Sequence, residues 1–226
     1  MSDNNSQYDR IGSKYDDYSR TATLKWIERH TISLMVEGID GARALDLACG
    51  LGFYTRLLQP YGAGQVIGVD ISPEMIPVVS QHEVADPPGM IYHGGNELEP
   101  PDLGFVHLIA AIWLLNDAKT KNERLHMFRI SYDKLNEESR FVAFALNPAF
   151  DFRTVNFIKY GCSYTKTGFR EFAWHAPEGS PDDVKLYGQE YWQDFYTNCH
   201  GIGLICKKEL NPLQHRKIDV ALSGSI

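Results

Sequence analysis

The residues best suited to chemistry lie between positions 46 and 70 of this 226-residue chain. The segment DLACGLG, residues 46–52, places an acid before two alternating glycines, and a second acid, Asp70, follows 24 residues after Asp46. Glycines at 50 and 52 let the backbone pass close to a ligand because they carry no Cβ. A carboxylate at the end of the following strand can accept both hydroxyls of a ribose. The spacing therefore predicts a site for a ligand that contains a nucleoside.

Two kinds of nucleoside ligand fit such a loop. A dinucleotide fingerprint requires Gly-x-Gly-x-x-Gly, with the pyrophosphate at the helix N-terminus. Here Thr55 stands at the third glycine position. The carboxylate of Asp46 beside the loop would repel a pyrophosphate, whereas it suits a ligand that carries an amino group and a sulfonium. The residues therefore favour a cationic ligand, and a nicotinamide oxidoreductase is the weaker alternative.

Short apolar runs alternate with helical stretches along the first two thirds of the chain. This alternation predicts parallel strands joined by right-handed crossovers, which is a Rossmann-like α/β fold. Such a sheet binds its ligand beyond the carboxyl ends of its strands. Strands are expected at 44–48, 66–70, 90–92, 106–111 and 141–146, with two more near 172–175 and 204–206, and helices within 8–37, at 53–59, from 72 and at 120–135.

At these residues the chain resembles the class I S-adenosylmethionine-dependent methyltransferases. Asp46 to Gly52 is similar to their first motif, with Ala48 in place of the first glycine, and Asp70 is similar to the acid of their second motif. The resemblance covers about residues 40–146. It implies a mostly parallel seven-stranded sheet with helices on both faces and with the last strand antiparallel. It also implies S-adenosyl-L-methionine as the cofactor and a small molecule as the methyl acceptor.

The resemblance also implies which residues surround the ligands. It assigns Asp46, Gly50 and Gly52 to the methionine part of the cofactor, Asp70 to the ribose, Ile71 and Met75 to the adenine face, and Asn96 and Glu97 to the adenine edge. Tyr8, Tyr15, Ala48 and Ala111 complete the expected cofactor set, and Trp113 and Asn116 are the expected substrate contacts. Tyr8, Tyr15 and Trp113 could instead be packing aromatics, and Asn116 a helix cap. No catalytic base is assigned.

A closer resemblance extends over most of the chain. The opening YDRIGSKYDDY, the stretch AAIWLLNDA and the late NCHGIGLICK look like the small-molecule methyltransferases of toxoflavin biosynthesis. Those enzymes methylate ring nitrogens, which implies transfer to a nitrogen or oxygen of a heteroaromatic metabolite in secondary metabolism. Asn96 and His107 stand where acids are usual, and residues 162–168 are short where relatives have a strand pair and a helix. These departures support an alternative: a cofactor-binding accessory protein with weak or no catalysis.

Composition narrows the range of partners and locations. The net charge of −7 argues against nucleic acid or an anionic membrane as the main partner. No apolar run has the length of a membrane helix, and the N-terminus has no signal-peptide core. The four cysteines form no Cys-x-x-Cys pair, so we expect no structural metal and a cytoplasmic protein with reduced thiols. The oligomeric state stays open.

The expected organisation is a single domain over residues 1–226. Residues 1–40 would form an N-terminal helical cover and residues 41–146 the cofactor-binding core. Residues 147–208 would supply the substrate side and the C-terminal strands, and residues 209–226 a peripheral tail. This length suits one α/β domain better than two.

Overall fold

The structure is a computed structural model. It describes residues 23–72, 74–82, 90–95, 102–118, 120–145, 162–167, 169–174, 184–188, 203–208 and 218–222. In chain order the elements are α2 (Thr23–Met35), β1 (Arg43–Leu47), α3 (Phe53–Leu58), β2 (Gln65–Asp70), α4 (Met75–His82), β3 (Met90–Gly94), β4 (Val106–Ile112), the short 3-10 helix η3 (Leu114–Asp117), α5 (Lys121–Lys134), β5 (Leu135–Phe144), β6 (Cys162–Thr167), β7 (Phe169–Trp174), β8 (Val184–Gly188), β9 (Gly203–Lys208) and β10 (Ile218–Leu222). Strands and helices alternate as far as β5, as the apolar pattern predicts.

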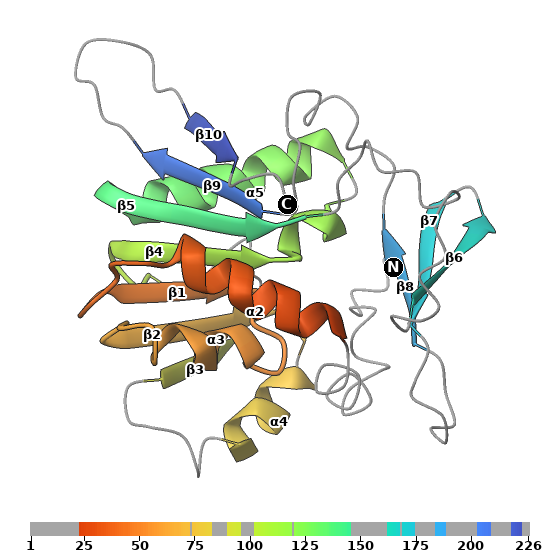
Figure 1. Ribbon diagram of the computed structural model, residues 1–226, viewed down its shortest axis with the longest axis horizontal. Coiled ribbons are helices and arrows are strands. Elements are labelled where there is room, and N and C mark those ends of the chain that lie inside the picture. Colours follow the sequence, from red (N-terminus) through yellow and green to blue (C-terminus); the bar gives the residue numbers. More distant parts are fainter. Residues whose placement is uncertain are drawn as a thin grey trace.

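The main sheet has seven strands in the order β10-β9-β5-β4-β1-β2-β3. The five strands from β5 to β3 in that order pair in parallel, so their carboxyl ends meet at one edge, on the right in Figure 1. The predicted Rossmann-like fold is therefore confirmed. One detail was wrong: the strand that runs against the five is β9, the last but one, and β10 then pairs antiparallel with β9.

The C-terminal strand β10 also bears on the expected peripheral tail. Residues 218–222 lie inside that tail, yet they form the edge strand of the main sheet through five pairs with β9, from Ile218 with Lys208 to Leu222 with Leu204. Its sequence IDVAL contains two β-branched residues, a composition that strands favour. The tail thus contributes one strand to the sheet.

A second, antiparallel sheet is built from β6, β7 and β8. In Figure 1 it stands on the side to which the carboxyl ends of the parallel strands point. Residues 162–168, which are short where relatives have a strand pair and a helix, contain β6, and β6 pairs with β7 from Cys162 with Trp174 to Thr167 with Phe169.

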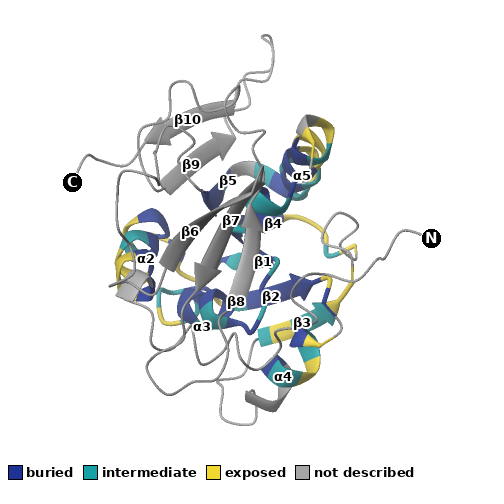
Figure 2. Ribbon diagram, turned by 90° about the vertical axis from the view of Figure 1, so that its right-hand side faces the viewer, coloured by how far each residue is buried: buried dark blue, intermediate teal, exposed yellow. Residues whose placement is uncertain are grey.

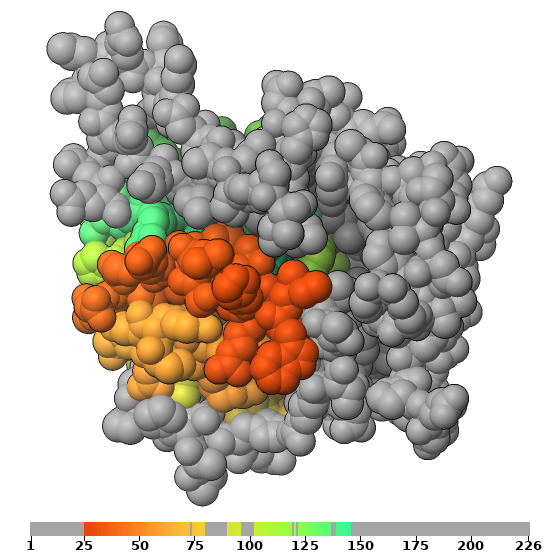
Figure 3. Space-filling view, in the orientation of Figure 1, coloured from red at the N-terminus to blue at the C-terminus, as the bar shows by residue number. Residues whose placement is uncertain are grey.

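The parallel strands bury alternate side chains on the two faces of the main sheet. On one face, Ala44, Leu108 and Phe144 pack with residues of α2 and α3. On the other, Leu45 and Ile109 pack with residues of α5. Figure 2 shows the buried central strands between α2 and α3 on one side and α5 on the other, and Figure 3 shows α2 and α3 side by side on one face. This alternation decides which side chains can reach the loop at the end of β1.

Two helix starts follow from local chemistry. Thr120 caps α5 through a reciprocal pair of hydrogen bonds with Glu123. α4 was expected to begin at residue 72, but it begins at Met75. Pro77 consequently lies in the first turn, where its missing N–H has no partner to lose. Among the described helices, none is long and apolar enough to cross a membrane.

Candidate functional site

The loop between β1 and α3 turns sharply through three left-handed residues. Ala48, Gly50 and Gly52 have φ values of 59°, 52° and 71°. The loop is fixed to the neighbouring strand, because the Cys49 N–H donates to the carbonyl of Val69 at 3.0 Å. Its backbone therefore follows a set path across the carboxyl ends of β1 and β2.

Gly52 cannot be replaced without movement of its neighbours. A Cβ at this position would lie 2.5 Å from Cγ2 of Val79 and 2.6 Å from the hydroxyl of Tyr92. Its positive φ independently favours glycine. Both requirements come from the turn and from the close approach of α4 and β3, so the second glycine of the motif is explained by packing as well as by ligand access.

Asp46 is a buried acid whose two carboxylate oxygens differ in their partners. It lies near the carboxyl end of β1, its side chain is 1% exposed, and its Oδ2 accepts a hydrogen bond from Oγ1 of Thr55 at 2.6 Å. Its Oδ1 has no hydrogen-bond partner within the described part of the chain. Burial raises the pKa of Asp46 from 3.8 to about 7, an effect that Thr55 partly opposes and that the charge of Asp70 strengthens. A cationic group placed at Oδ1 would favour the ionised form.

Asp70 ends β2 and organises the loop from the other side. Its Oδ2 accepts from the Gly50 N–H at 2.7 Å, and its Oδ1 accepts from the Ser72 N–H at 2.8 Å. Its main-chain carbonyl accepts from the Gly95 N–H at 2.9 Å, which ties the end of β3 to the end of β2. The two backbone donors hold the carboxylate in one orientation at the end of β2, next to the glycine loop.

The other predicted site residues are distributed unevenly around this centre. Ile71 is 43% exposed beside Asp70, whereas Met75 is 1% exposed at the start of α4 and offers little surface to an adenine. Ala111 is fully buried in the cluster on the α5 face. Trp113 follows β4 directly and Asn116 lies in η3, both half-buried. Tyr8, Tyr15, Asn96 and Glu97 lie outside the described residues.

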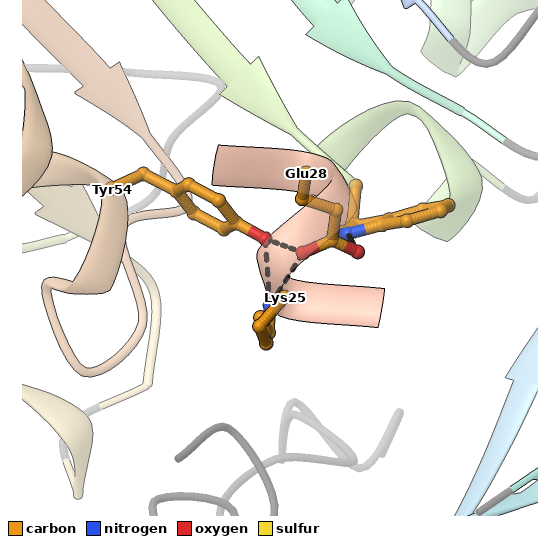
Figure 4. Close-up of polar contacts among 4 residues, drawn as sticks. Lys25, Glu28 and Tyr54 are labelled. Carbon is orange, nitrogen blue, oxygen red and sulfur yellow. Dashed lines mark hydrogen bonds and ion pairs between the residues drawn. The ribbon is translucent and has the colours of Figure 1, made fainter. Parts of the chain in front are cut away.

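A buried polar cluster borders the same edge of the sheet (Figure 4). Glu28 of α2 accepts a hydrogen bond from the hydroxyl of Tyr54 and, at 3.1 Å, from the indole Nε1 of Trp113. Lys25 Nζ lies 3.1 Å from Glu28 Oε2 and donates to the Tyr54 hydroxyl at 2.6 Å. The same ammonium lies 5.4 Å from the ring centroid of Phe53. The cluster joins α2, α3 and the end of β4.

Sequence reasoning missed several of these residues. Thr55 was noted only as a break in a dinucleotide motif, but its hydroxyl at that position is the donor to Asp46. Its spacing of nine residues from the acid is a signal that could have been used. Glu28 and Lys25 read as the polar residues of an amphipathic helix, and nothing in their spacing connects them to Tyr54 or Trp113. Among the described residues, no group of three His, Cys, Asp or Glu side chains could hold a metal ion.

Comparisons with known proteins bear on this site. The family described as "Methyltransferase domain" matches residues 44–135. The matched segment is less than half of the 226-residue chain. The match runs from β1 to the start of β5 and includes the loop, Asp46, Asp70 and Trp113. No curated protein matches the sequence.

Solved structures of other proteins resemble this fold. The PH0226 protein from Pyrococcus horikoshii is 18% identical with a TM-score of 0.61, covering 84% of this chain and 86% of that one. The N-methyltransferase NodS from Bradyrhizobium japonicum, solved with S-adenosyl-L-homocysteine, is 14% identical with a TM-score of 0.56, covering 83% and 98%. An S-adenosylmethionine-dependent methyltransferase from Mesorhizobium loti is 24% identical with a TM-score of 0.44, and the match spans about half, 53%, of each chain.

Together the fold and the family match support the class that the sequence resembles. The family match over residues 44–135 agrees with the predicted enzyme class, an S-adenosylmethionine-dependent methyltransferase, and with the predicted cofactor. The narrower resemblance to toxoflavin biosynthesis is not confirmed.

Proposed function

We propose that this chain binds S-adenosyl-L-methionine at the carboxyl ends of β1 and β2 and transfers its methyl group to a nitrogen or oxygen of a small, heteroaromatic metabolite. The observation that carries the proposal is the buried Oδ1 of Asp46 beneath the glycine loop, which has no hydrogen-bond partner among the described residues. A buried acceptor without a partner is costly, and a ligand cation would satisfy it. The bound cofactor supplies a methyl group on a sulfonium, which is already activated for displacement.

The residues fit the parts of this cofactor in a consistent order. Asp46 suits the amino group, and the backbone of Ala48, Gly50 and Gly52 leaves room for the methionine part. Asp70 suits the ribose hydroxyls, because its carboxylate stands at the end of the second parallel strand and is oriented beside the glycine loop by the N–H groups of residues 50 and 72. The exposed side chain of Ile71 suits one adenine face. For Met75, Ala111, Asn96, Glu97, Tyr8 and Tyr15 the proposed cofactor contacts rest on the resemblance alone.

The acceptor is proposed from the end of β4. Trp113 is half-buried there, and a flat aromatic ring suits stacking against a heteroaromatic acceptor. Asn116, three residues on, can supply a donor and an acceptor at the ring edge. Methyl displacement mainly requires alignment of the reactants and exclusion of water. The structural neighbour NodS is an N-methyltransferase, which agrees with a nitrogen acceptor.

A second candidate is a cofactor-binding accessory protein with weak or no catalysis. It rests on Asn96 and His107, which stand where relatives have acids. His107 lies at the opposite end of β4 from Trp113, and its Nδ1 accepts from the Arg43 N–H at 3.1 Å. Its position indicates a role in joining β1 to β4, which weakens this argument for an inactive site.

Isothermal titration with S-adenosyl-L-homocysteine tests the cofactor site. The Asp70→Ala variant should lose about 1–3 kcal/mol of binding free energy through the lost hydrogen bonds, roughly a 5- to 150-fold weaker affinity. The Asp133→Ala variant, which alters an exposed acid in α5, is the matched control and should bind as the unaltered chain does. Unchanged affinity in Asp70→Ala would show that Asp70 does not bind the ribose. Cofactor binding without methyl transfer to any of a panel of heteroaromatic amines and phenols would favour the accessory protein.

A further inference from the structure

The carboxylate of Glu28 is the centre of the buried polar cluster. It is 6% exposed and accepts from Trp113 on one oxygen, Oε1. Its other oxygen, Oε2, is shared by the hydroxyl of Tyr54 and the ammonium of Lys25. Charge is balanced within the cluster, because the ammonium that pairs with Glu28 is buried beside it. A buried carboxylate with three donors is held in one orientation and holds its donors in return.

The donors of Glu28 come from the two chain segments that border the candidate cofactor site. Tyr54 lies two residues after Gly52, at the start of α3, and Trp113 is the first residue after β4. Both segments begin at the carboxyl edge of the sheet, and Figure 1 shows one end of α2 near that edge. Glu28 therefore connects α2 to the loop segment and to the β4 segment at once.

Trp113 has a strained backbone conformation that its neighbours must hold in place. Its φ of 70° is left-handed, which is strained for a residue with a bulky side chain. Its backbone N–H donates to the carbonyl of Phe144 at 3.1 Å, and the two rings lie 6.2 Å apart. Strained residues persist when their surroundings over-determine them, and they cluster at functional sites. The bond from the indole to Glu28 adds the contact that fixes the plane of the ring.

We propose that Glu28 is a positioning residue of the methyl-transfer site: through Tyr54 and Trp113 it holds α2, the glycine loop and the ring after β4 in the arrangement that binds the cofactor. This inference rests on the function proposed above. Glu28 itself is enclosed by its own partners, so it acts through Tyr54 and Trp113. The N-terminal part of α2 then borders the site, and Glu28 is the group that ties this part of the helix to Tyr54 and Trp113.

The plain alternative is that Glu28 only anchors a helix. The chain offers a matched control for this, because Arg140 of β5 anchors the other end of α2. Its Nη1 and Nη2 donate to the carbonyls of Met35 and Glu37 at 3.2 and 2.7 Å. A variant of Arg140 loosens α2 without touching Tyr54 or Trp113. The two variants separate positioning of the site from stability of the helix.

The test uses the full chain with the substitutions Glu28→Gln and Arg140→Gln, and S-adenosyl-L-homocysteine as the probe. Titration calorimetry should show at least fivefold weaker binding in Glu28→Gln and less than a twofold change in Arg140→Gln. The ¹H–¹⁵N resonance of the Trp113 indole, identified by its loss in Trp113→Phe, supplies a spectroscopic readout. The indole N–H proton of Trp113 should exchange with solvent at least tenfold faster in Glu28→Gln and at an unchanged rate in Arg140→Gln. Melting temperatures should fall in both variants.

The outcomes distinguish the proposals. Equal loss of affinity in the two variants, or no loss in Glu28→Gln, overturns the positioning role. Equal exchange rates of the Trp113 indole proton in the unaltered chain and in Glu28→Gln also overturn the positioning role, because the hydrogen bond to Glu28 would then not slow the exchange. If the unaltered chain binds no S-adenosyl-L-homocysteine, the proposed function fails first and this inference fails with it.

Discussion

Replacing Asp46 with asparagine tests the electrostatics of the site directly. Burial raises the pKa of Asp46 from 3.8 to about 7, so ionisation of this carboxyl opposes folding of the ligand-free protein. A difference of this size corresponds to at most ~4 kcal/mol when both folded and unfolded states are fully ionised. Asparagine keeps the shape and the acceptor for Thr55 but removes the charge.

The sign of the effect follows from linkage. Because the pKa of Asp46 is higher in the folded protein, the free energy of unfolding is greatest, as far as this group is concerned, below pH about 4, where Asp46 is protonated in both states. It falls as the pH rises until the pH passes about 7. Asp46→Asn escapes this loss, although its amide leaves a buried donor without a partner at a cost of about 1–3 kcal/mol. We expect the variant to be more stable than the unaltered chain by about 1–3 kcal/mol at pH 8. At pH 4.5 the escaped loss is only about 1 kcal/mol, so the variant should be as stable as the unaltered chain or less stable by up to about 2 kcal/mol.

Thermal melts at the two pH values measure this difference. A gain of 1–3 kcal/mol corresponds to roughly 2–12 °C for a chain of this size. Asp133→Asn, which changes an exposed acid in α5, is the control and should shift the melting temperature little at either pH. A variant less stable than the unaltered chain at pH 8, or a gain that does not depend on pH, would refute the reasoning. The same variant should bind S-adenosyl-L-homocysteine more weakly, because the partner of its amino group is gone.

Two further predictions concern the loop. Ala48→Gly should stabilise the chain by at most about 1 kcal/mol, because relief of the strained φ of Ala48 outweighs the flexibility that glycine adds to the unfolded chain. Denaturant titration measures this change in the free energy of unfolding. A loss above about 1 kcal/mol would contradict the prediction. Gly52→Ala should destabilise the chain by about 1–3 kcal/mol and weaken cofactor binding, since its Cβ would meet Val79 and Tyr92. An unchanged melting temperature and an unchanged affinity in calorimetry would show that Val79 and Tyr92 move aside at little cost.

Much of the fold could be predicted from short-range pattern. Alternating apolar runs and helical stretches fix strand and helix identity locally, so the five parallel strands fall near their expected positions. The direction of β9 and the presence of β10 could not be predicted in this way, because strand order and polarity depend on pairs between residues far apart in the chain. The pairing of β6 with β7 was likewise not predicted, because neither strand has the strict apolar alternation that marks a half-buried strand.

By itself the sequence determined the loop and its two acids. Asp46, the glycines and Asp70 lie close in the chain, and the turn that they make is governed by local backbone geometry. Only the tertiary structure decided that Thr55 takes one oxygen of Asp46 and leaves the other without a partner among the described residues, and that Glu28 joins Tyr54 to Trp113 across 26 and 85 positions of sequence. The physical reason is that hydrogen bonds between side chains depend on which faces of the sheet and helices meet, and packing alone sets this.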